Sequence, residues 1–284
     1  MSRRLLTLII AVALGVIPGR TLLAQGSANE SPLRILVVND DGYQSPGLVA
    51  LVDSLVTIAA VTVAAPREQQ SGTGHGISFR DPITIVELGN PYAIQWYAID
   101  AKPATVVKVA LTTLMDTMPD LVISGVNTGD NVGTHVWISG TVAAARDAAL
   151  QGFPAIAASV AYGGPQDFAV AAGIVKELVQ QLADAGKIQP GLLLNVNIPS
   201  GGSSAIKGIR VAPQSLRIGI QRYDERVSPR GSRYVWDNWS PAADDSVTTS
   251  DLHAFARGYI TITPLKLDQT DVTQLEELGK LLER

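Results

Sequence analysis

Two adjacent carboxylates follow an apolar stretch near the start of the chain. Residues 35–38 read Ile-Leu-Val-Val and run directly into Asn39, Asp40, Asp41 and Gly42. Such apolar, mostly β-branched residues are typical of a strand buried on both faces. Ligands bind at the carboxyl ends of strands in an open parallel sheet, and two carboxylates that lose water there need a cation. Oxygen ligands favour Mg²⁺ or Mn²⁺, although Asp-Gly could also be only a turn.

Two later segments carry polar groups after expected strands. Residues 66–76 contain Ser71 in a glycine-rich loop, and residues 120–133 contain Asn127 and Asn131 after a short apolar strand. An asparagine carbonyl can ligate a hard metal, and the amide can donate to a phosphate oxygen. Each segment alone could be a surface loop or a turn, because glycine and asparagine favour both.

A further segment places hydroxyl groups at the start of an expected helix. Ser139, Gly140 and Thr141 precede an alanine-rich stretch. Alone, this is an ordinary N-cap, but the free N–H groups of a helix N-terminus also bind anions. A divalent cation beside an anion-binding helix start predicts metal-assisted hydrolysis of a phosphate ester.

The elements that must position these residues alternate between strand and helix. This order predicts a doubly wound α/β fold with a mostly parallel sheet. Strands are expected at residues 33–38, 61–65, 83–88, 94–99, 121–123, 155–160, 192–198 and 258–264. Helices are expected at residues 46–58, 104–114, 141–150, 168–185 and 272–282.

Composition excludes several kinds of site. The 284 residues are 46% hydrophobic, enough for a sizeable core, and the net charge of −4 gives no sign of a nucleic-acid duplex as partner. The absence of cysteine excludes thiol nucleophiles and cysteine-bound zinc. Of the three histidines, His75 and His135 could donate a proton to a leaving group or could be solvated loop residues. No role is expected for His253.

Residues 1–24 have the layout of a signal peptide. Arg3 and Arg4 precede an uncharged apolar run, and cleavage is expected after Ala24. The run of about 13 residues is short for a membrane span, although an uncleaved anchor is the alternative. The arginine pair leaves both the Sec and the twin-arginine routes open. We therefore expect a periplasmic or secreted protein without a stable membrane anchor, in which residues 25–32 form a linker.

The pattern changes after about residue 209. We expect residues 33–210 to form the catalytic core and residues 211–284 to form a C-terminal extension with a β-arm, a final strand and a helix. The β-arm region combines arginine with Tyr223, Tyr234, Trp236 and Trp239. This composition is typical of interface anchors, so we expect the extension to mediate assembly.

The combined order of motifs resembles the SurE family (survival protein E) of metal-dependent 5′/3′-nucleotidases. The segments that carry the resemblance are residues 39–42, 65–72, 124–131 and 139–145, with further matches at 194–199, 229–236 and 258–265. The resemblance extends from Arg34 to about Asp271. It implies a three-layer α/β/α core and a C-terminal extension used in oligomerisation, as a homodimer or homotetramer.

The resemblance also implies the site and its reaction. One divalent metal ion, Mg²⁺ or Mn²⁺, would be held by Asp40, Asp41, Ser71 and Asn127. The phosphate would be bound by Asn131, Ser139, Gly140 and Thr141, and the catalytic residues would be Asp40, Asp41 and Asn131. The expected reaction is release of phosphate from nucleoside 5′/3′-monophosphates, other phosphoesters or short polyphosphate, through a metal-activated water.

Two other functions are open to the same sequence. The first is an exported protein that binds nucleotide or phosphate without turnover, which a phosphate-release assay would distinguish. The second is a nicotinamide oxidoreductase. The glycines of residues 72–76 argue against it, because they lack the spacing of the dinucleotide fingerprint and open no clear helix.

Overall fold

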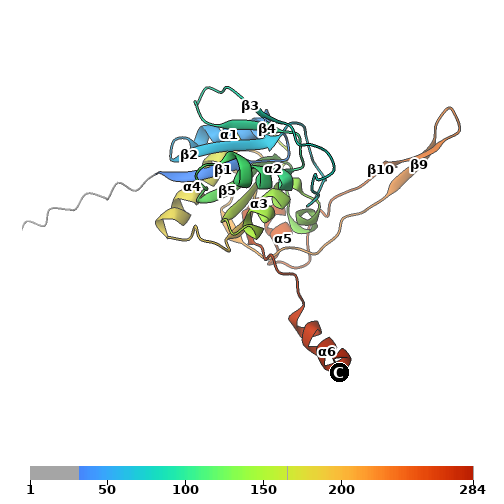
Figure 1. Cartoon of the computed structure of the whole chain (residues 1–284). Coiled ribbons are helices and arrows are strands. Elements are labelled where there is room, and N and C mark those ends of the chain that lie inside the picture. The colour runs from blue at the N-terminus through green and yellow to red at the C-terminus, as the bar shows by residue number, and fades with distance from the viewer. Residues whose placement is uncertain (1–31, 165, 284) are drawn as a thin grey trace, which may run out of the picture. The chain divides into compact units, whose positions relative to one another are not determined.

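A nine-stranded sheet forms the centre of the molecule. The computed structural model describes residues 32–164 and 166–283 (Figure 1), so the expected signal peptide and nearly all of the expected linker lie outside the described residues. The strand order is β3-β4-β2-β1-β5-β6-β7-β11-β8. Within these residues, no helix is both long enough and apolar enough to cross a membrane.

The observed elements follow the expected alternation. The strands of the sheet are β1 (Leu33–Val38), β2 (Ala59–Pro66), β3 (Ile85–Glu87), β4 (Trp96–Ile99), β5 (Leu121–Thr128), β6 (Ala155–Val160), β7 (Leu193–Ile198), β8 (Ile209–Val211) and β11 (Ile260–Pro264). The helices are α1 (Pro46–Leu55), α2 (Pro103–Val109), α3 (Gly140–Leu150), α4 (Gln166–Asp184), α5 (Asp251–Ala256) and α6 (Val272–Leu282). A π-helical turn continues α2 over Ala110–Leu114, and short 3₁₀ turns lie at Gly133–Trp137 and Ser203–Ala205.

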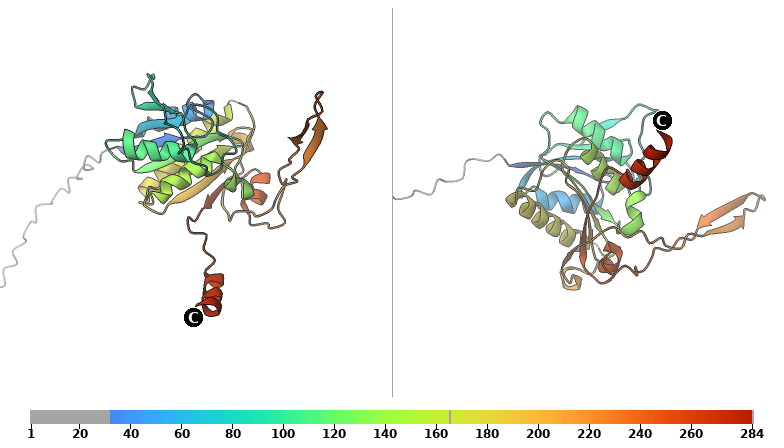
Figure 2. Two further views of the ribbon diagram at one scale, coloured as in Figure 1. Left: turned by 45° about the vertical axis from the view of Figure 1, so that its right-hand side comes forward. Right: turned by 90° about the horizontal axis from the view of Figure 1, so that it is seen from below.

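Helices cover both faces of the sheet, which makes the three-layer α/β/α arrangement (Figure 2). In β1, Ile35 and Val37 pack in the core on the face of α1 and α4. Leu36 and Val38 pack in the core on the face of α2 and α3. All four side chains are fully buried, as the continuous apolar stretch predicted. The expected α/β fold class is confirmed.

The strand β5 is longer than expected. The sequence predicted its end at Ile123, but the strand continues through polar and glycine residues to Thr128. Its register with β6 is interrupted between Ser124 and Asn127. Gly125 lies there at φ +140°, and an added Cβ atom would come within 2.2 Å of the Ala158 carbonyl oxygen. Only glycine fits this close approach, so the segment expected to follow the strand is instead an irregular part of it.

The end of the chain returns to the central sheet. Strand β11 lies between β7 and β8, antiparallel to β7 and parallel to β8. The boundary expected between residues 210 and 211 falls inside β8, so the expected core and the final strand share one sheet. From Pro32 onward, the chain accordingly forms a single compact unit.

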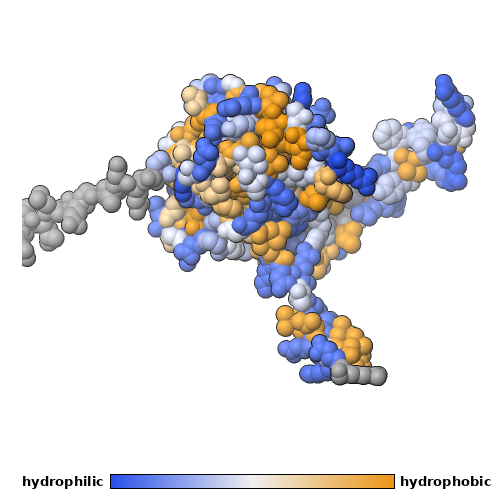
Figure 3. All heavy atoms as spheres, in the orientation of Figure 1, coloured by the Kyte–Doolittle hydropathy of each residue, from blue (hydrophilic) through white to orange (hydrophobic). Residues whose placement is uncertain are grey.

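Two C-terminal elements remain outside this sheet. The hairpin of β9 (Tyr223–Val227) and β10 (Arg233–Asp237) matches the expected β-arm, and all of its strand residues are exposed. Helix α6 has no buried residue, and its leucines give it an apolar surface that is visible in Figure 3. The exposed leucines are Leu275, Leu278, Leu281 and Leu282.

Candidate metal and phosphate site

Three neighbouring strands bring the predicted residues to one edge of the sheet. Strand β1 lies between β2 and β5, and all three run parallel. Their carboxyl ends therefore open on the same side, where ligands bind in such sheets. The backbone N–H of Gln70, after β2, donates to the carbonyl oxygen of Asp40, after β1, at 2.7 Å. The backbone N–H of Thr128, at the end of β5, donates to the Asp41 carboxylate at 3.0 Å.

Asp40 is a buried carboxylate held by the start of α3. Its residue is only 3% exposed, and the Thr141 hydroxyl donates to its Oδ1 atom. Burial raises the pKa of Asp40 to about 6, against the lowering effect of the Thr141 hydrogen bond, and the charge of Asp41 raises it further. A Cβ atom on Gly140 would lie 2.8 Å from the Asp40 carboxylate, so glycine is what lets the helix approach this closely.

Asp41 lies at the solvent side of the pair. It is partly buried, and burial raises its pKa against the lowering effects of Thr128 and Gln69. The Gln69 amide also donates to the Ser71 hydroxyl at 3.2 Å. Gln69 therefore contacts Ser71 and lies near enough to Asp41 to affect its pKa.

Asn127 lies at the same edge, near the carboxyl end of β5. Its amide nitrogen donates to the Gly129 carbonyl oxygen at 2.7 Å, which orients the side chain. The amide oxygen is thus the atom available to a cation. The β5 irregularity at Gly125, two residues earlier, shifts the register in which Asn127 pairs with β6 and so affects the direction of its side chain.

The chemistry of these residues fits a hard divalent cation. In the described part of the chain, no group of three or more histidine, cysteine, aspartate or glutamate side chains could hold a metal ion. The predicted ligands include only two carboxylates, and the other two are hydroxyl and amide oxygens. Two carboxylates with raised pKa values, side by side, are a pair that a cation would stabilise in the ionised form. An all-oxygen set of this kind suits Mg²⁺ or Mn²⁺.

Asn131 belongs to a buried polar network rather than to a free loop. Its backbone N–H donates to Asn197 at 2.6 Å, its side-chain amide donates to Ser159 at 2.8 Å, and its carbonyl oxygen accepts from Asn195 at 2.8 Å. Ser159 and the two asparagines of β7 are not among the site residues predicted from the sequence. The signal was the alternation Asn195-Val196-Asn197, which puts two polar side chains on one face of a buried strand.

The helix start that was expected to bind phosphate is formed as predicted. Ser139 is the N-cap of α3, and its hydroxyl accepts from the Val142 N–H at 3.1 Å. Ser139, Gly140 and Thr141 are all buried. The Thr141 hydroxyl already donates to Asp40 and the Val142 N–H to Ser139, so the remaining first-turn N–H groups and the helix dipole are the features left for an anion.

All three histidines contact other protein groups, including His75 and His135, the two that were considered as proton donors. His75 Nε2 lies 3.1 Å from the carboxylate of Asp147 on α3. His135 Nδ1 lies 3.3 Å from the Asp130 carbonyl oxygen, and its ring packs against Trp239 with centroids 4.9 Å apart. His253 lies on α5 and contacts the Asp245 carbonyl oxygen, away from the predicted ligands.

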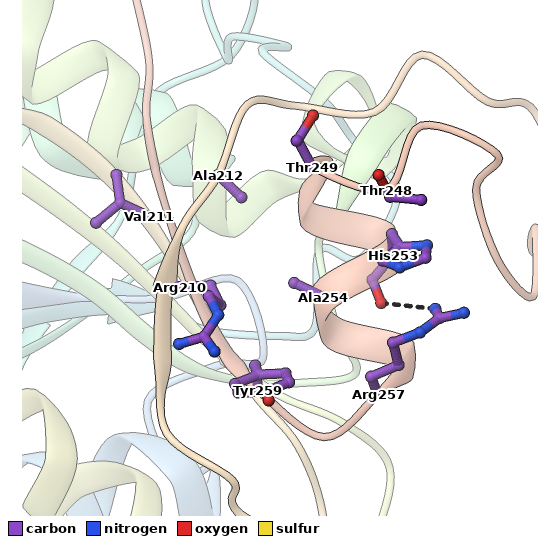
Figure 4. A pocket seen from close by; sticks show the side chains of 9 residues that line it. All are labelled: Arg210, Val211, Ala212, Thr248, Thr249, His253, Ala254, Arg257 and Tyr259. Carbon is purple, nitrogen blue, oxygen red and sulfur yellow. Dashed lines mark hydrogen bonds between the residues drawn. The ribbon is translucent and has the colours of Figure 1, made fainter.

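A hollow of about 390 Å³ opens beside Asp41. Its lining includes Tyr43, Gln44, Arg67 and Thr128, so it has room for a small molecule next to the carboxylate pair. Another hollow, of about 410 Å³, lies between β8, α5 and the start of β11 (Figure 4). It is lined by Arg210, His253, Arg257 and Tyr259, among others, and by none of the predicted site residues.

Comparison with known proteins gives a consistent set of relatives. The model of the family described as "Survival protein SurE" matches residues 35–220. A protein named "5'-nucleotidase SurE" from Syntrophobacter fumaroxidans is 39% identical over 248 residues, which cover 87% of this chain and 99% of that protein. Its namesake from Synechococcus elongatus is 38% identical over 258 residues, covering 88% and 99%. The crystal structure of the SurE protein from Aquifex aeolicus superposes with a TM-score of 0.76 at 32% identity, covering 87% of this chain and 99% of that chain.

The raised pKa of Asp40 predicts how pH affects the metal-free protein. The pKa of aspartate is about 3.9 in an unfolded chain, whereas in the folded chain that of Asp40 is about 6. The folded state therefore holds this proton more tightly. The resulting stabilisation is fully present below about pH 3.9 and is lost as pH rises through about 6, a difference on the order of 2–3 kcal/mol.

Urea unfolding with a chelator present measures this effect. The amide introduced by Asp40→Asn cannot titrate, so the difference in free energy of unfolding between wild type and variant isolates the carboxylate of Asp40. As pH rises from about 4 to 7, we expect the wild type to lose stability relative to Asp40→Asn. A difference that stays constant, or that shifts in favour of the wild type, would contradict the assigned environment.

The contact between Thr141 and Asp40 gives a second prediction. Thr141→Ala removes a hydrogen bond to a buried carboxylate, so the free energy of unfolding at neutral pH should fall by about 1–3 kcal/mol. Thr141→Ser keeps the donor and should recover most of this loss. Equal losses in the two variants in chemical denaturation would show that the methyl group, not the hydroxyl, matters.

Proposed function

This chain belongs to the SurE family, and on that basis we propose that it is a divalent-metal-dependent phosphomonoesterase acting on nucleoside 5′/3′-monophosphates. Relatives at 38–39% identity over 87–88% of the chain are named 5'-nucleotidase, which supports a nucleotidase. The observation that carries the proposal is the meeting of two carboxylates with a helix start at one edge of the sheet.

The carboxylates and their neighbours would hold one divalent metal ion, Mg²⁺ or Mn²⁺. The proposed ligands are Asp40, Asp41, Ser71 and Asn127. A bound ion of this kind supplies charge neutralisation of the phosphate and lowers the pKa of a coordinated water. The protein fixes the geometry: Thr141 holds Asp40, the Thr128 N–H holds Asp41, and the Gly129 carbonyl orients Asn127.

The start of α3 would bind the phosphate. Its first-turn N–H groups have no partner within the helix and carry the positive end of the helix dipole. We assign phosphate binding to Ser139, Gly140 and Thr141 on this ground, together with Asn131, whose position is fixed by Ser159 and β7. The hollow beside Asp41 would then take the rest of a small substrate.

Other phosphoesters and short polyphosphate are further substrates to test, since a helix start and a cation recognise the phosphate rather than the group attached to it. The alternative function, binding of nucleotide without turnover, is separated by assaying phosphate release from a panel of nucleotides. Multiple turnovers per chain would exclude it.

Activity should depend on a divalent metal ion and on Asp40. Chelation should abolish phosphate release, and Mg²⁺ or Mn²⁺ should restore it. Asp40→Asn keeps the shape of the side chain but removes a charge from the ligand set. It should lower turnover by about two orders of magnitude or more, comparable with the loss of other key electrostatic groups, while circular dichroism shows an intact fold. Full activity after exhaustive chelation would refute the metal assignment.

The C-terminal extension is proposed to assemble the chain into a homodimer or homotetramer. Exposed Tyr223, Tyr234 and Trp236 on the hairpin, and the exposed leucines of α6, support this because clustered apolar side chains on a surface mark interaction sites. Light scattering on the purified protein should give a mass of two or four chains. Trp236→Ser together with Leu278→Ser should lower that mass. A wild-type protein that is monomeric at all accessible concentrations would rule out the assembly.

We further propose that the protein is exported, by the Sec or the twin-arginine route. The basic start, the apolar run and Leu22-x-Ala24 support this, and they lie outside the described residues. N-terminal sequencing of protein recovered from the source cells should give Gln25 as the first residue, in a periplasmic or secreted fraction. An intact Met1 in the cytoplasmic fraction would exclude export.

A further inference from the structure

Asp147 is a fully buried carboxylate outside the proposed ligand set. It projects from α3, and its side chain is 0% exposed. Its Oδ1 atom lies 3.1 Å from His75 Nε2 and 2.6 Å from Lys108 Nζ, while Oδ2 accepts from Gln151 at 2.8 Å. A carboxylate buried at this depth is stable only when it is paired and hydrogen-bonded, and these three donors meet that need.

The surroundings keep this carboxylate ionised. Burial by itself would raise the pKa of Asp147, but hydrogen bonds from His75 and Lys108 outweigh it and hold that pKa below the usual value. His75 and Lys108 are the titratable groups that face the carboxylate, from the loop after β2 and from α2 respectively. Asp147 therefore joins three parts of the chain through one buried charge.

The loop that carries His75 also carries Ser71. Residues 67–84, all of which the structure describes, contain no helix or strand, so their position depends on individual contacts. The Gln70 N–H donates to the backbone carbonyl oxygen of Asp40, and the Gly74 N–H donates to that of Ile138. The Ser78 N–H donates to the Thr105 hydroxyl. Ordering each loop residue costs about 1–2 kcal/mol of backbone entropy, so each of these few contacts matters.

We propose that Asp147 is a positioning residue for the active site. Through His75 it holds the loop of residues 71–76 against α3 and so keeps Ser71 beside Asp41, while the start of the same helix keeps Thr141 beside Asp40. One helix thereby fixes both sides of the ligand set. This rests on the metal site proposed above, and Asp147 acts through His75 rather than by contact with metal or substrate.

The same geometry assigns His75 a structural task. Its Nε2 atom faces Asp147, so the imidazole serves as the donor that secures the loop and not as the proton donor to a leaving group. A glutamine side chain can place its amide nitrogen near the position of Nε2 but cannot transfer a proton in the same pH range. His75→Gln should therefore preserve the loop, whereas His75→Ala should release it.

Hydrogen exchange and metal binding together test the proposal. In Asp147→Asn and His75→Ala, the amides of residues 70–78 should exchange about tenfold faster, since local opening there becomes easier. Calorimetry with Mn²⁺ should show affinity weakened by about tenfold, which corresponds to about 1.4 kcal/mol. His75→Gln should stay within about threefold of wild type in both measurements, the scatter expected for a conservative change. If Asp147→Asn does not fold, His75→Ala is used for the test instead. That variant removes only one of the three groups that contact Asp147 and keeps its carboxylate.

Asp167→Asn is the matched control. Asp167 is also a buried carboxylate, 3% exposed, and it accepts from the backbone N–H groups of Gly164, Gly201 and Gly202. It thus secures loops after β6 and β7 that carry none of the proposed metal ligands. This variant should leave Mn²⁺ affinity and the exchange of residues 70–78 at the wild-type level.

Two results would overturn the proposal. The first is a folded Asp147→Asn variant with wild-type loop exchange and Mn²⁺ affinity. The second is a His75→Gln variant that loses turnover as His75→Ala does while its exchange and Mn²⁺ affinity stay unchanged, since the imidazole would then act chemically. If the wild type binds no Mn²⁺, the proposed function fails, whereas loop exchange still decides whether Asp147 holds the loop.

Discussion

The burial of one carboxylate next to another is the constraint around which this fold is arranged. Asp40 is almost completely enclosed, its pKa is raised by that burial, and Asp41 adds repulsion. Local contacts of the site offset part of the free-energy cost of burying these two charges. The Thr141 hydroxyl and the Thr128 N–H donate to the pair, and Gly140 lets the positive end of α3 reach Asp40. What these groups leave uncompensated is the charge that a divalent ion would neutralise.

Close approach of backbone to backbone is what makes this arrangement possible. A Cβ atom at Gly47 would lie 1.9 Å from the Val126 carbonyl oxygen, and one at Gly125 would lie 2.2 Å from that of Ala158. These two glycines bring α1 against β5 and β5 against β6, and the irregular part of β5 delivers Asn127 to the site. On the opposite face of the sheet, the alanines of α3 also allow a close approach, because their small side chains let the helix lie near the strands.

Local patterns in the sequence were enough for most of the elements and for expecting the proposed ligands at one edge of the sheet. The apolar run of β1, the N-cap at Ser139 and the polar residues after parallel strands are short-range signals with a direct physical meaning. The contact between His75 and Asp147 could not be predicted, because it joins residues 72 positions apart and no local pattern connects them. The insertion of β11 beside β7 was missed for a related reason. Periodicity identifies a strand but says nothing of its neighbours, so an α/β core was expected to end at residue 210.

The place of β11 in the sheet has a consequence for biosynthesis. Among the described strands, β8 pairs only with β11, which is synthesised about fifty residues later. The edge of β7 that faces away from β6 also remains unpaired until β11 is made. A nascent chain that has emerged only as far as residue 211 therefore exposes the hydrogen-bonding edge of a buried strand, a template for wrong pairing. Completion of this sheet is a late, long-range event. A chain of this topology must reach nearly its full length before its fold is protected against aggregation.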